Sequence, residues 1–365
     1  MDYMRRALAL ARQALGSTSP NPAVGAVIVK DGEVIGEGYT RPPGGPHAEV
    51  VALGRAEERA RGATLYVTLE PCCHFGRTPP CTRAIIEAGV ARVQVATLDP
   101  NPLVAGRGVL ELRGAGIEVV LGEQEAEAQE INEAYVKYIT TGLPFAIAKF
   151  AMSLDGKIAT RTGDAKWVSG PLARRQAHRL RRIVDAIMAG ANTVLADDPQ
   201  LTYRRRDDKV HPGDRQPLRV VVDSRGRVPA TSQVFQGPGK AMLVTARPLE
   251  AEKARQLSLR GVEVLEMPSE GGRVDLLQLL RILGERQVTS LLVDGGGILL
   301  GSFFDLGLVD KVEAAIAPII IGGKDAVPTV VGIGVERVAQ ALRLERLKVR
   351  RAGQDIIVMG YIARQ

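Results

Sequence analysis

Four residues near the start of the chain have types and spacing suited to hydrolytic metal chemistry. His47 and Glu49 form a His-x-Glu pair, and Cys72 and Cys81 each follow a proline. One imidazole and two thiolates are a familiar ligand set for catalytic zinc, which keeps its fourth position for water. His-x-Glu followed by Pro-Cys segments is typical of zinc-dependent nucleobase deaminases, in which the glutamate moves protons and is not a ligand. The pattern therefore predicts Zn²⁺ held by His47, Cys72 and Cys81, with Glu49 as the catalytic proton shuttle.

The expected chemistry is hydrolysis of an amidine. Zinc lowers the pKa of its bound water towards neutrality, and the resulting hydroxide attacks the amidine carbon. Glu49 would take the water proton and hand it to the departing ammonia. A closed structural zinc site is the main alternative, but its fourth ligand would have to be His74 or Cys73. A disulfide is disfavoured because the number of cysteines, 3, is odd and nothing suggests export.

Length and composition limit the classes to which the protein can belong. A chain of 365 residues is long for one domain, so two are expected. Hydrophobic residues at 45% and charged residues at 24% are typical of a soluble globular protein. Aromatic residues make up only 4%, which disfavours a base-stacking surface for nucleic acid. The net charge of +7 could suit nucleic acid, but it also suits phosphorylated metabolites and a phosphorylated cofactor. With no signal peptide and no bilayer-spanning apolar run, we expect a cytoplasmic enzyme without a membrane partner.

Strand and helix patterns alternate along the whole chain, which predicts an α/β architecture. In the first part, Asp31-Gly32 indicates a hairpin, and a strand after it delivers Cys72 at its end. The expected strands are 24–29, 33–39, 64–69, 90–97 and 117–121, and the expected helices are 2–15, 48–61, 82–88, 108–114 and 124–138. This order predicts a three-layer α/β/α unit. The best boundary lies at 140–144, which gives domains 1–143 and 144–365.

The second part continues the alternation. Its expected strands are 145–151, 186–190, 218–223, 241–245, 262–266, 290–294, 311–317 and 355–361, and its expected helices are 171–184, 250–258 and 274–284. Residues 193–204 are expected to form a long loop. The glycine run that begins at Gly295 follows a strand and opens a helix, whose amides could bind a pyrophosphate. It does not match Gly-x-Gly-x-x-Gly in register, so a turn without a ligand is the alternative.

Several side chains in this second part are suited to a ligand, although each has a plain structural alternative. Arg181 and Arg204 could bind a phosphate, because a guanidinium fork binds phosphate bidentately. Lys149 could polarise a carbonyl or could be a simple surface charge. Trp167, the only tryptophan, could contact a ligand or belong to the core.

Read together, these motifs resemble the bifunctional riboflavin-biosynthesis proteins that fuse a pyrimidine deaminase to a reductase. The resemblance spans roughly residues 1–361. It rests on Asn21-Pro22, His47-Ala48-Glu49, the run from Leu69 to Cys81, Asp99-Pro100-Asn101-Pro102, and the second-half motifs at 149–157 and 197–202. It implies a cytidine-deaminase-like N-terminal domain and a dihydrofolate-reductase-like C-terminal domain. It also implies deamination of 2,5-diamino-6-ribosylamino-4(3H)-pyrimidinone 5′-phosphate, followed by reduction of the ribosyl group to ribityl with NADPH.

The resemblance also implies site residues. Those of the deaminase pocket are Asn21, His74, Arg77 and Asn101. Those for NADPH are Ala151, Trp167, Thr193, Asp197, Ser224, Gly296, Gly297, Ile298, Leu299, Leu300, Gly301 and Ser302. Those for the substrate of the reductase are Arg181, Leu201, Arg204 and Asp294, to which the chemistry adds Lys149. The family tends to self-associate, so a homo-oligomer is expected.

Three positions depart from the family pattern. Cys73 stands where serine is frequent, and Ala165 stands where a polar residue often touches substrate. Asp294 replaces a more usual glutamate, which shortens its reach towards the sugar by one methylene.

Two rival functions are weaker. A nucleic-acid deaminase would usually carry Cys-x-x-Cys, whereas 8 residues separate Cys72 from Cys81. A ligand-binding protein without activity is disfavoured by the intact His47 and Glu49.

Overall fold

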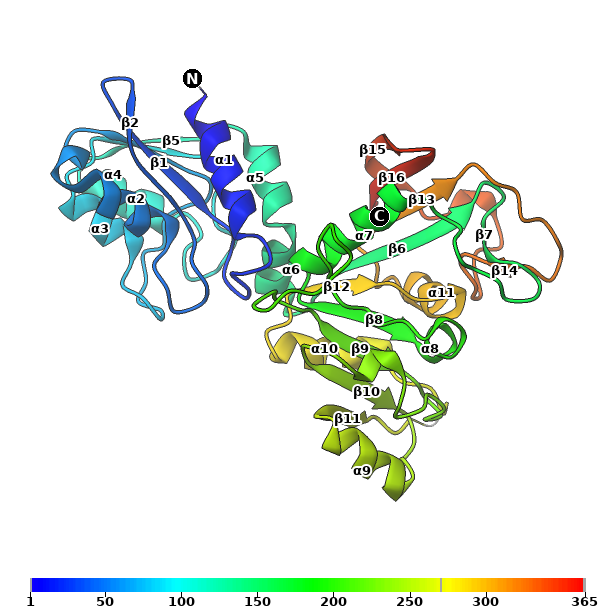
Figure 1. Ribbon diagram of the computed structural model, residues 1–365. Coiled ribbons are helices and arrows are strands. Elements are labelled where there is room, and N and C mark those ends of the chain that lie inside the picture. The colour runs from blue at the N-terminus through cyan, green and yellow to red at the C-terminus, as the bar shows by residue number, and fades with distance from the viewer. Residues whose placement is uncertain (1, 270, 364–365) are drawn as a thin grey trace. The chain divides into compact units, whose positions relative to one another are not determined.

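The computed structural model describes residues 2–269 and 271–363. The chain folds as two compact units, Met1–Leu143 and Pro144–Gln365 (Figure 1). In the part of the chain that the structure describes, every helix is too short or too polar to cross a lipid bilayer.

The first unit is built on a five-stranded mixed sheet. Strand β1 is antiparallel to β2 and β3, whereas β3, β4 and β5 run parallel. The strands, in their order across the sheet, are β2 (Glu33–Tyr39), β1 (Gly25–Lys30), β3 (Thr64–Val67), β4 (Arg92–Val95) and β5 (Glu118–Leu121). The tight turn between β1 and β2 confirms the predicted hairpin.

Helices cover both faces of this sheet, because successive side chains of a strand point to opposite sides. Ala26 and Ile28 of β1 belong to a core shared with α2, α3 and α4, and Val27 and Val29 belong to a core shared with α1 and α5. The helices are α1 (Tyr3–Ala14), α2 (Ala48–Ala56), α3 (Cys81–Glu87), α4 (Arg107–Gly114), α5 (Glu125–Ile131) and α6 (Glu133–Thr141). The predicted three-layer α/β/α unit is confirmed.

One long helix over 124–138 was a wrong expectation, because the chain breaks at Asn132 between α5 and α6. The buried Asn132 side chain accepts a hydrogen bond from the backbone N–H of Ala23 at 2.8 Å and donates one to its carbonyl at 3.1 Å. An asparagine that satisfies a distant backbone in this way fixes the segment before β1, which carries Asn21.

The second unit contains a nine-stranded sheet. Its first seven strands run parallel, and the last two are antiparallel to their neighbours. Their order is β11 (Val262–Glu266), β10 (Ala241–Thr245), β9 (Leu218–Val222), β8 (Ala186–Gly190), β12 (Ser290–Val293), β6 (Phe145–Ser153), β13 (Lys311–Ala317), β16 (Asp355–Ile362) and β15 (Leu344–Ala352). Strands β7 (Lys157–Ala159) and β14 (Val327–Pro328) form a separate small sheet. The mixed α/β class predicted for this half is confirmed.

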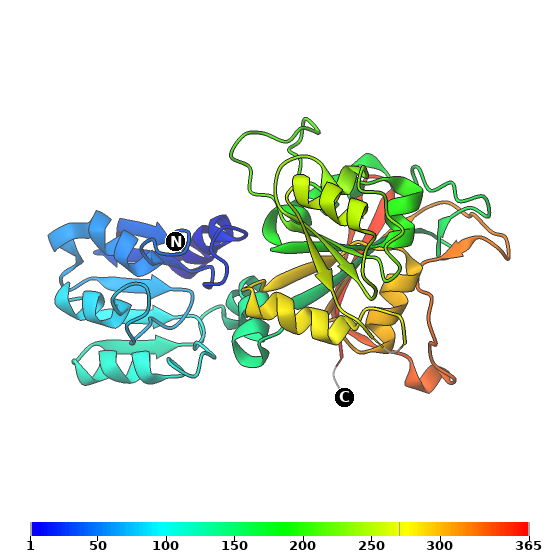
Figure 2. The same cartoon turned by 90° about the horizontal axis from the view of Figure 1, so that it is seen from below.

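The helices of this unit flank the nine-stranded sheet (Figure 2). They are α7 (Pro171–Ile183), α8 (Ala191–Asp197), α9 (Ala251–Leu259), α10 (Leu276–Glu285) and α11 (Gly297–Asp305). The expectation of a loop over 193–204 is wrong for its first residues, because α8 runs to Asp197. The helix ends where Asp198 adopts φ 42°, just before Pro199. Strand β15 was missed because its residues are charged and mostly exposed, without the alternation of a half-buried strand.

Candidate functional site

The start of helix α2 holds His47 and Glu49. His47 is the extended N-cap residue, with φ −72° and ψ 164°, and Glu49 lies in the first turn. The helix lies very close to strand β2, since a Cβ on Gly38 would be 2.2 Å from the carbonyl oxygen of Ala48. Glycine is therefore required at this position of β2, because any larger residue would displace the helix start and both functional side chains.

The two cysteines come from neighbouring pieces of backbone. Cys72 lies in the loop after β3, and Cys81 is the first residue of α3. The backbone N–H of Cys81 points at the Cys72 sulfur, 3.4 Å away, and the N–H of Thr82 donates to the Cys72 carbonyl at 3.2 Å. The loop between the cysteines is thus closed by its own hydrogen bonds.

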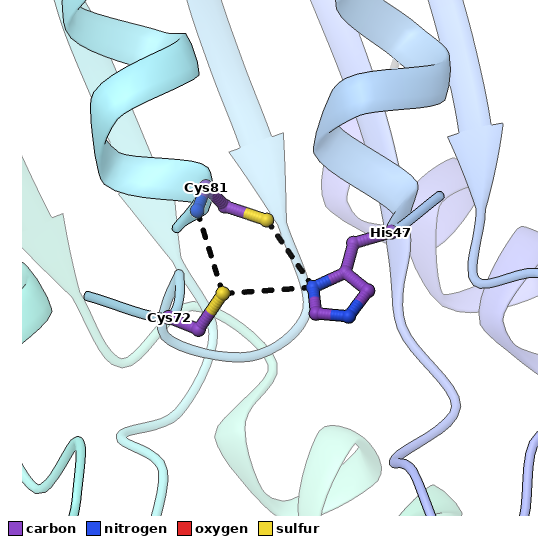
Figure 3. Close-up of side chains that lie close together, drawn as sticks. All are labelled: His47, Cys72 and Cys81. Atoms are coloured by element: carbon purple, nitrogen blue, oxygen red, sulfur yellow. Dashed lines mark hydrogen bonds between the residues drawn. The ribbon is translucent and has the colours of Figure 1, made fainter. Parts of the chain in front are cut away.

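The three predicted ligands point towards one another (Figure 3). The Nδ1 atom of His47 lies 3.5 Å from the Cys72 sulfur and 3.3 Å from the Cys81 sulfur. All three donor atoms lie within 4.8 Å of one another. A tetrahedral zinc ion with ordinary Zn–S and Zn–N bonds would separate sulfur from nitrogen by about 3.5 Å. The donor set and its spacing therefore fit zinc, with Nδ1 as the ligating atom of the imidazole.

The electrostatics of this cluster favour a thiolate at Cys72, whereas the neighbouring Cys72 and burial raise the pKa of Cys81. A hydrogen bond from Cys81 lowers the pKa of Cys72 to about 4, with a further contribution from His47. Glu49 is only 4% exposed, and its burial, together with the nearby Cys72 thiolate, raises its pKa to about 7. Its carboxyl group also interacts with the Cys81 thiol, so Glu49 lies directly beside the three predicted zinc ligands.

Cys73 lies outside this cluster. Its thiol donates to the carbonyl oxygen of Leu103 at 3.8 Å, and burial raises its pKa. A group of His, Cys or acidic residues able to hold a metal was found in the described residues only at His47, Cys72 and Cys81.

The residues predicted around the pyrimidine differ in how they are held. Asn21 is half-buried and its backbone N–H donates to Thr18 at 2.8 Å. The buried Nδ1 of His74 has no hydrogen-bond partner within the described ranges, and Arg77 is exposed. Asn101 accepts a hydrogen bond from the N–H of Leu103 at 3.0 Å. An unsatisfied buried nitrogen such as that of His74 is suited to a ligand atom.

Sequence reasoning missed Thr78. Its hydroxyl lies 3.4 Å from Nε2 of His47, the ring nitrogen opposite the thiols. Only the position of Thr78 between the two cysteines could have singled it out.

The second unit has a partly buried charge cluster centred on Asp294, which directly follows β12. The carboxylate lies 3.0 Å from Nζ of Lys149 and 2.9 Å from a terminal nitrogen of Arg181. Burial alone would raise the pKa of Asp294, but the two cations outweigh it and hold the pKa far below its ordinary value. The reading of Lys149 as a simple surface charge is therefore wrong, and the short aspartate reaches both cations.

Arg181 and Arg204 lie in one polar network with His178. Arg181 donates to the carbonyl of Thr202 at 3.3 Å, and the N–H of Arg204 donates to Nδ1 of His178 at 3.3 Å. The Arg204 guanidinium binds Gln200 at 2.8 Å. Burial and the two arginines lower the pKa of His178 to about 4, so this ring is neutral at pH 7. His178 was not singled out from the sequence, where it is one histidine in an arginine-rich helix.

The glycine run at the start of α11 contacts other parts of the protein. The N–H of Gly296 donates to Oγ1 of Thr193 at 2.7 Å, which joins α8 to α11. A Cβ on Gly297 would lie 2.6 Å from the carbonyl of Pro328, and one on Gly301 would lie 1.0 Å from that of Val331. These two glycines therefore admit the backbone around Pro328 and Val331, which a larger residue would displace.

The other residues predicted for NADPH are spread over several elements. Trp167 is 69% exposed and stacks 4.6 Å from the Arg174 guanidinium, so it is not a core residue. Leu299 and Leu300 are buried in α11, whereas Ile298 is 56% exposed. The remaining ones are Ala151 on β6, Asp197 at the end of α8, Ser224 after β9 and Ser302 on α11. Leu201, predicted for the substrate, is buried, and Ala165 lies in the loop before Trp167.

Comparisons with known proteins cover both units. Residues 144–358 match the family model described as RibD C-terminal domain, and residues 1–97 match the cytidine and deoxycytidylate deaminase zinc-binding region. The riboflavin biosynthesis protein RibD of Aquifex aeolicus is 45% identical over 98% of this chain and 97% of its own length. RibD of Escherichia coli is 43% identical over 97% of each chain.

Solved structures agree. One form of Acinetobacter baumannii RibD superposes with a TM-score of 0.88 at 41% identity, covering 99% of this chain and 98% of that one. A Thermotoga maritima protein described as a diaminohydroxyphosphoribosylaminopyrimidine deaminase/5-amino-6-(5-phosphoribosylamino)uracil reductase gives a TM-score of 0.86 at 37% identity, with 99% and 98% covered. With two units of matching fold and a fitting zinc cluster, this chain belongs to the RibD family of riboflavin biosynthesis proteins.

Proposed function

We propose that this chain catalyses two successive steps of riboflavin biosynthesis. The first is hydrolytic deamination of 2,5-diamino-6-ribosylamino-4(3H)-pyrimidinone 5′-phosphate in the unit 1–143. The second is reduction of the ribosyl side chain by NADPH in the unit 144–365, giving 5-amino-6-ribitylamino-2,4-pyrimidinedione 5′-phosphate. The observation that carries this proposal is the convergence of His47, Cys72 and Cys81 beside the buried carboxyl group of Glu49.

In the deaminase unit, each residue has a distinct proposed part. His47, Cys72 and Cys81 would hold Zn²⁺, which when bound acts as a Lewis acid that activates a water molecule for attack. Glu49 would accept the proton of that water and deliver it to the amino nitrogen that leaves as ammonia. Burial raises the pKa of Glu49 above that of an ordinary carboxyl group, which suits a group that must accept and then donate a proton.

The pyrimidine and its phosphate are assigned to the residues around this centre: Asn21, His74, Arg77 and Asn101. The exposed guanidinium of Arg77 can approach a phosphate, and the unpartnered Nδ1 of His74 can bind a polar atom of the ring or sugar. Both lie in the loop that joins Cys72 to Cys81, so the metal ligands and these contacts share one segment.

In the reductase unit, Asp294 would hold Lys149 in place at the reacting carbonyl. NADPH supplies the hydride. The ammonium of Lys149 would polarise the open-chain sugar carbonyl, and Arg181 and Arg204 would anchor the phosphate. A phosphate anchor fixes the carbonyl relative to the hydride donor, which lowers the barrier by restricting orientation. The NADPH contacts proposed are Ala151, Trp167, Thr193, Asp197, Ser224 and the segment from Gly296 to Ser302.

Self-association belongs to this proposal. Strand β15 forms one edge of the nine-stranded sheet, and its Leu347 and Val349 are 58% and 67% exposed. An edge strand with exposed apolar side chains is suited to pairing with a second copy of the chain. We place the enzyme in the cytoplasm, where the free cysteines Cys72, Cys73 and Cys81 stay reduced.

Purified protein tests the function directly. It is incubated with the diaminopyrimidine phosphate, with and without NADPH, alongside elemental analysis for zinc and a parallel incubation with tRNA. We expect zinc to be bound, ammonia to be released without NADPH, and NADPH to be oxidised only once the deaminated product is present. Ammonia release from tRNA alone would indicate a nucleic-acid deaminase. Protein without zinc and without ammonia release would contradict the proposal.

A further inference from the structure

A buried carboxylate connects the loop that carries Cys72 to a second loop of the first unit. Glu70 is 3% exposed and lies two positions before Cys72. Its Oε2 accepts hydrogen bonds from the N–H groups of Asp99 at 3.2 Å and Gly106 at 2.9 Å, and its Oε1 accepts one from Val109 at 3.0 Å. All three donors belong to one stretch of chain, so this single side chain fixes the 99–109 segment and the start of α4.

The two backbones also touch directly. A Cβ on Gly108 would lie 2.2 Å from the carbonyl oxygen of Pro71, the residue between Glu70 and Cys72. The N–H of Glu70 donates to the Thr97 carbonyl at 3.0 Å, which extends the contact towards β4. The loop that carries Cys72 and the loop that carries Asn101 are therefore held at a fixed distance and orientation.

Asp99 and Tyr135 continue this network to Asn101. Asp99 accepts hydrogen bonds from the N–H of Asn101 at 2.9 Å and from the Tyr135 hydroxyl at 3.0 Å. The Asn101 side-chain oxygen accepts the N–H of Leu103 at 3.0 Å. The backbone N–H and the side-chain oxygen of Asn101 are both held in this way. The two N–H donors of its carboxamide nitrogen therefore face a fixed direction, in which they can meet a ligand.

We propose that Glu70, Asp99 and Tyr135 are positioning residues of the deaminase site, which aim the Asn101 carboxamide at the pyrimidine substrate. This assignment rests on the proposed function. None of the three would touch the metal or the reacting atoms. Glu70 sets the distance between the two loops, and the Asp99–Tyr135 pair holds the backbone N–H of Asn101, from which the amide side chain projects.

The test is Tyr135→Phe, which keeps the ring in the core and removes the hydroxyl. Tyr138→Phe makes the same change in the same helix and is the matched control. Removal of one hydrogen bond that orients a contact to substrate should raise KM for the diaminopyrimidine phosphate roughly two- to tenfold. We expect kcat to change less than KM, with bound zinc and reductase activity as in the wild type. Tyr138→Phe should resemble the wild type in every readout.

Glu70→Gln provides a second variant of the same shape. Its amide nitrogen cannot accept the N–H groups that one carboxylate oxygen now accepts, so KM should again rise while zinc content is kept. If Tyr135→Phe deaminates with unchanged KM, or if both variants lose activity only in proportion to lost zinc, the positioning role is wrong. Wild-type protein that releases no ammonia in the same assay would instead overturn the proposed function, and this assignment with it.

Discussion

The hydroxyl of Thr78 lies 3.4 Å from Nε2 of His47, while Nδ1 of the same ring faces the sulfurs of Cys72 and Cys81. A neutral imidazole that binds a metal through one nitrogen carries its proton on the other and usually donates it to an outer-shell acceptor. Thr78 is placed to be that acceptor, which would fix both the tautomer and the orientation of the ligand.

Thr78→Val should therefore weaken zinc binding. The substitution keeps the branched shape and removes the acceptor, and the loss of such an outer-shell partner lowers metal affinity by about 10- to 100-fold. Competition between the protein and a chromophoric chelator measures this change without any assay of activity. Thr78→Ser restores the hydroxyl and should bind zinc as the wild type does. Equal affinities for the valine and wild-type proteins would show that the contact has no role in metal binding.

Cys73→Ser should leave the zinc content unchanged. The Cys73 thiol is directed at Leu103 and lies apart from the cluster, so its replacement removes no ligand. Cys72→Ser is the contrasting variant, and we expect it to lose most of the metal. Elemental analysis of both purified proteins gives the result. If Cys73→Ser lost its zinc while Cys72→Ser kept it, the two adjacent cysteines would have been assigned the wrong way round.

Glu49→Gln should separate metal binding from catalysis. The amide fills the same volume but cannot accept a proton, so deamination should fall by roughly 10²- to 10⁴-fold while zinc stays bound. The reductase step should persist when the deaminated substrate is supplied. Glu58→Gln, at an exposed position shortly after α2, is the control and should keep full activity. Retained deamination in Glu49→Gln would remove Glu49 from its proposed role.

The convergence of His47, Cys72 and Cys81 could be predicted because its signal is local in sequence. A His-x-Glu pair at a helix start and two Pro-Cys pairs define the chemistry before any tertiary contact is known. The layers of the first unit followed for a similar reason, since alternating strands such as β1 show which residues face each side. Helix α8 was missed because it is short and the turn residues Asp198 and Pro199 follow it directly. Strand β15 was missed because most of its residues are charged and exposed.

Long-range polar contacts could not be predicted. Lys149 and Asp294 are 145 positions apart, and Glu70 and Asp99 are 29 apart, so only the folded sheet brings each pair together. Composition gives no sign of which buried charge meets which partner. The roles of Gly297 and Gly301 were equally hidden, because the backbone they admit comes from the segment around Pro328 and Val331.

Arg204→Ala should weaken binding of the phosphorylated substrate by the reductase. A hydrogen bond between charged groups contributes about 1.5–3 kcal/mol, so KM for this substrate should rise about 10- to 100-fold. KM for NADPH should be roughly unchanged. Arg206→Ala, at an exposed position in the same loop, is the control and should affect neither value. Equal losses for both ligands in Arg204→Ala would place this side chain elsewhere in the site.

Asp294→Asn should destabilise the second unit at neutral pH. The substitution leaves Lys149 and Arg181 partly buried without their counter-charge, and removal of one partner from a buried ion pair costs about 3–5 kcal/mol. Urea unfolding of wild type and variant measures the difference. Trp167, the only tryptophan, lies in this unit and provides the fluorescence signal.

The same variant should change how stability depends on pH. The pKa of Asp294 is lower in the folded protein than in the unfolded chain, so its ionisation stabilises the fold fully above the unfolded pKa of about 3.9. This contribution is lost only as pH falls below that value towards the folded pKa. The difference in unfolding free energy between wild type and Asp294→Asn should therefore be constant between about pH 6 and 8 and shrink below about pH 4. A gap that stayed constant down to the lowest pH at which the unit folds would show that Asp294 is not held as a carboxylate by its two cations.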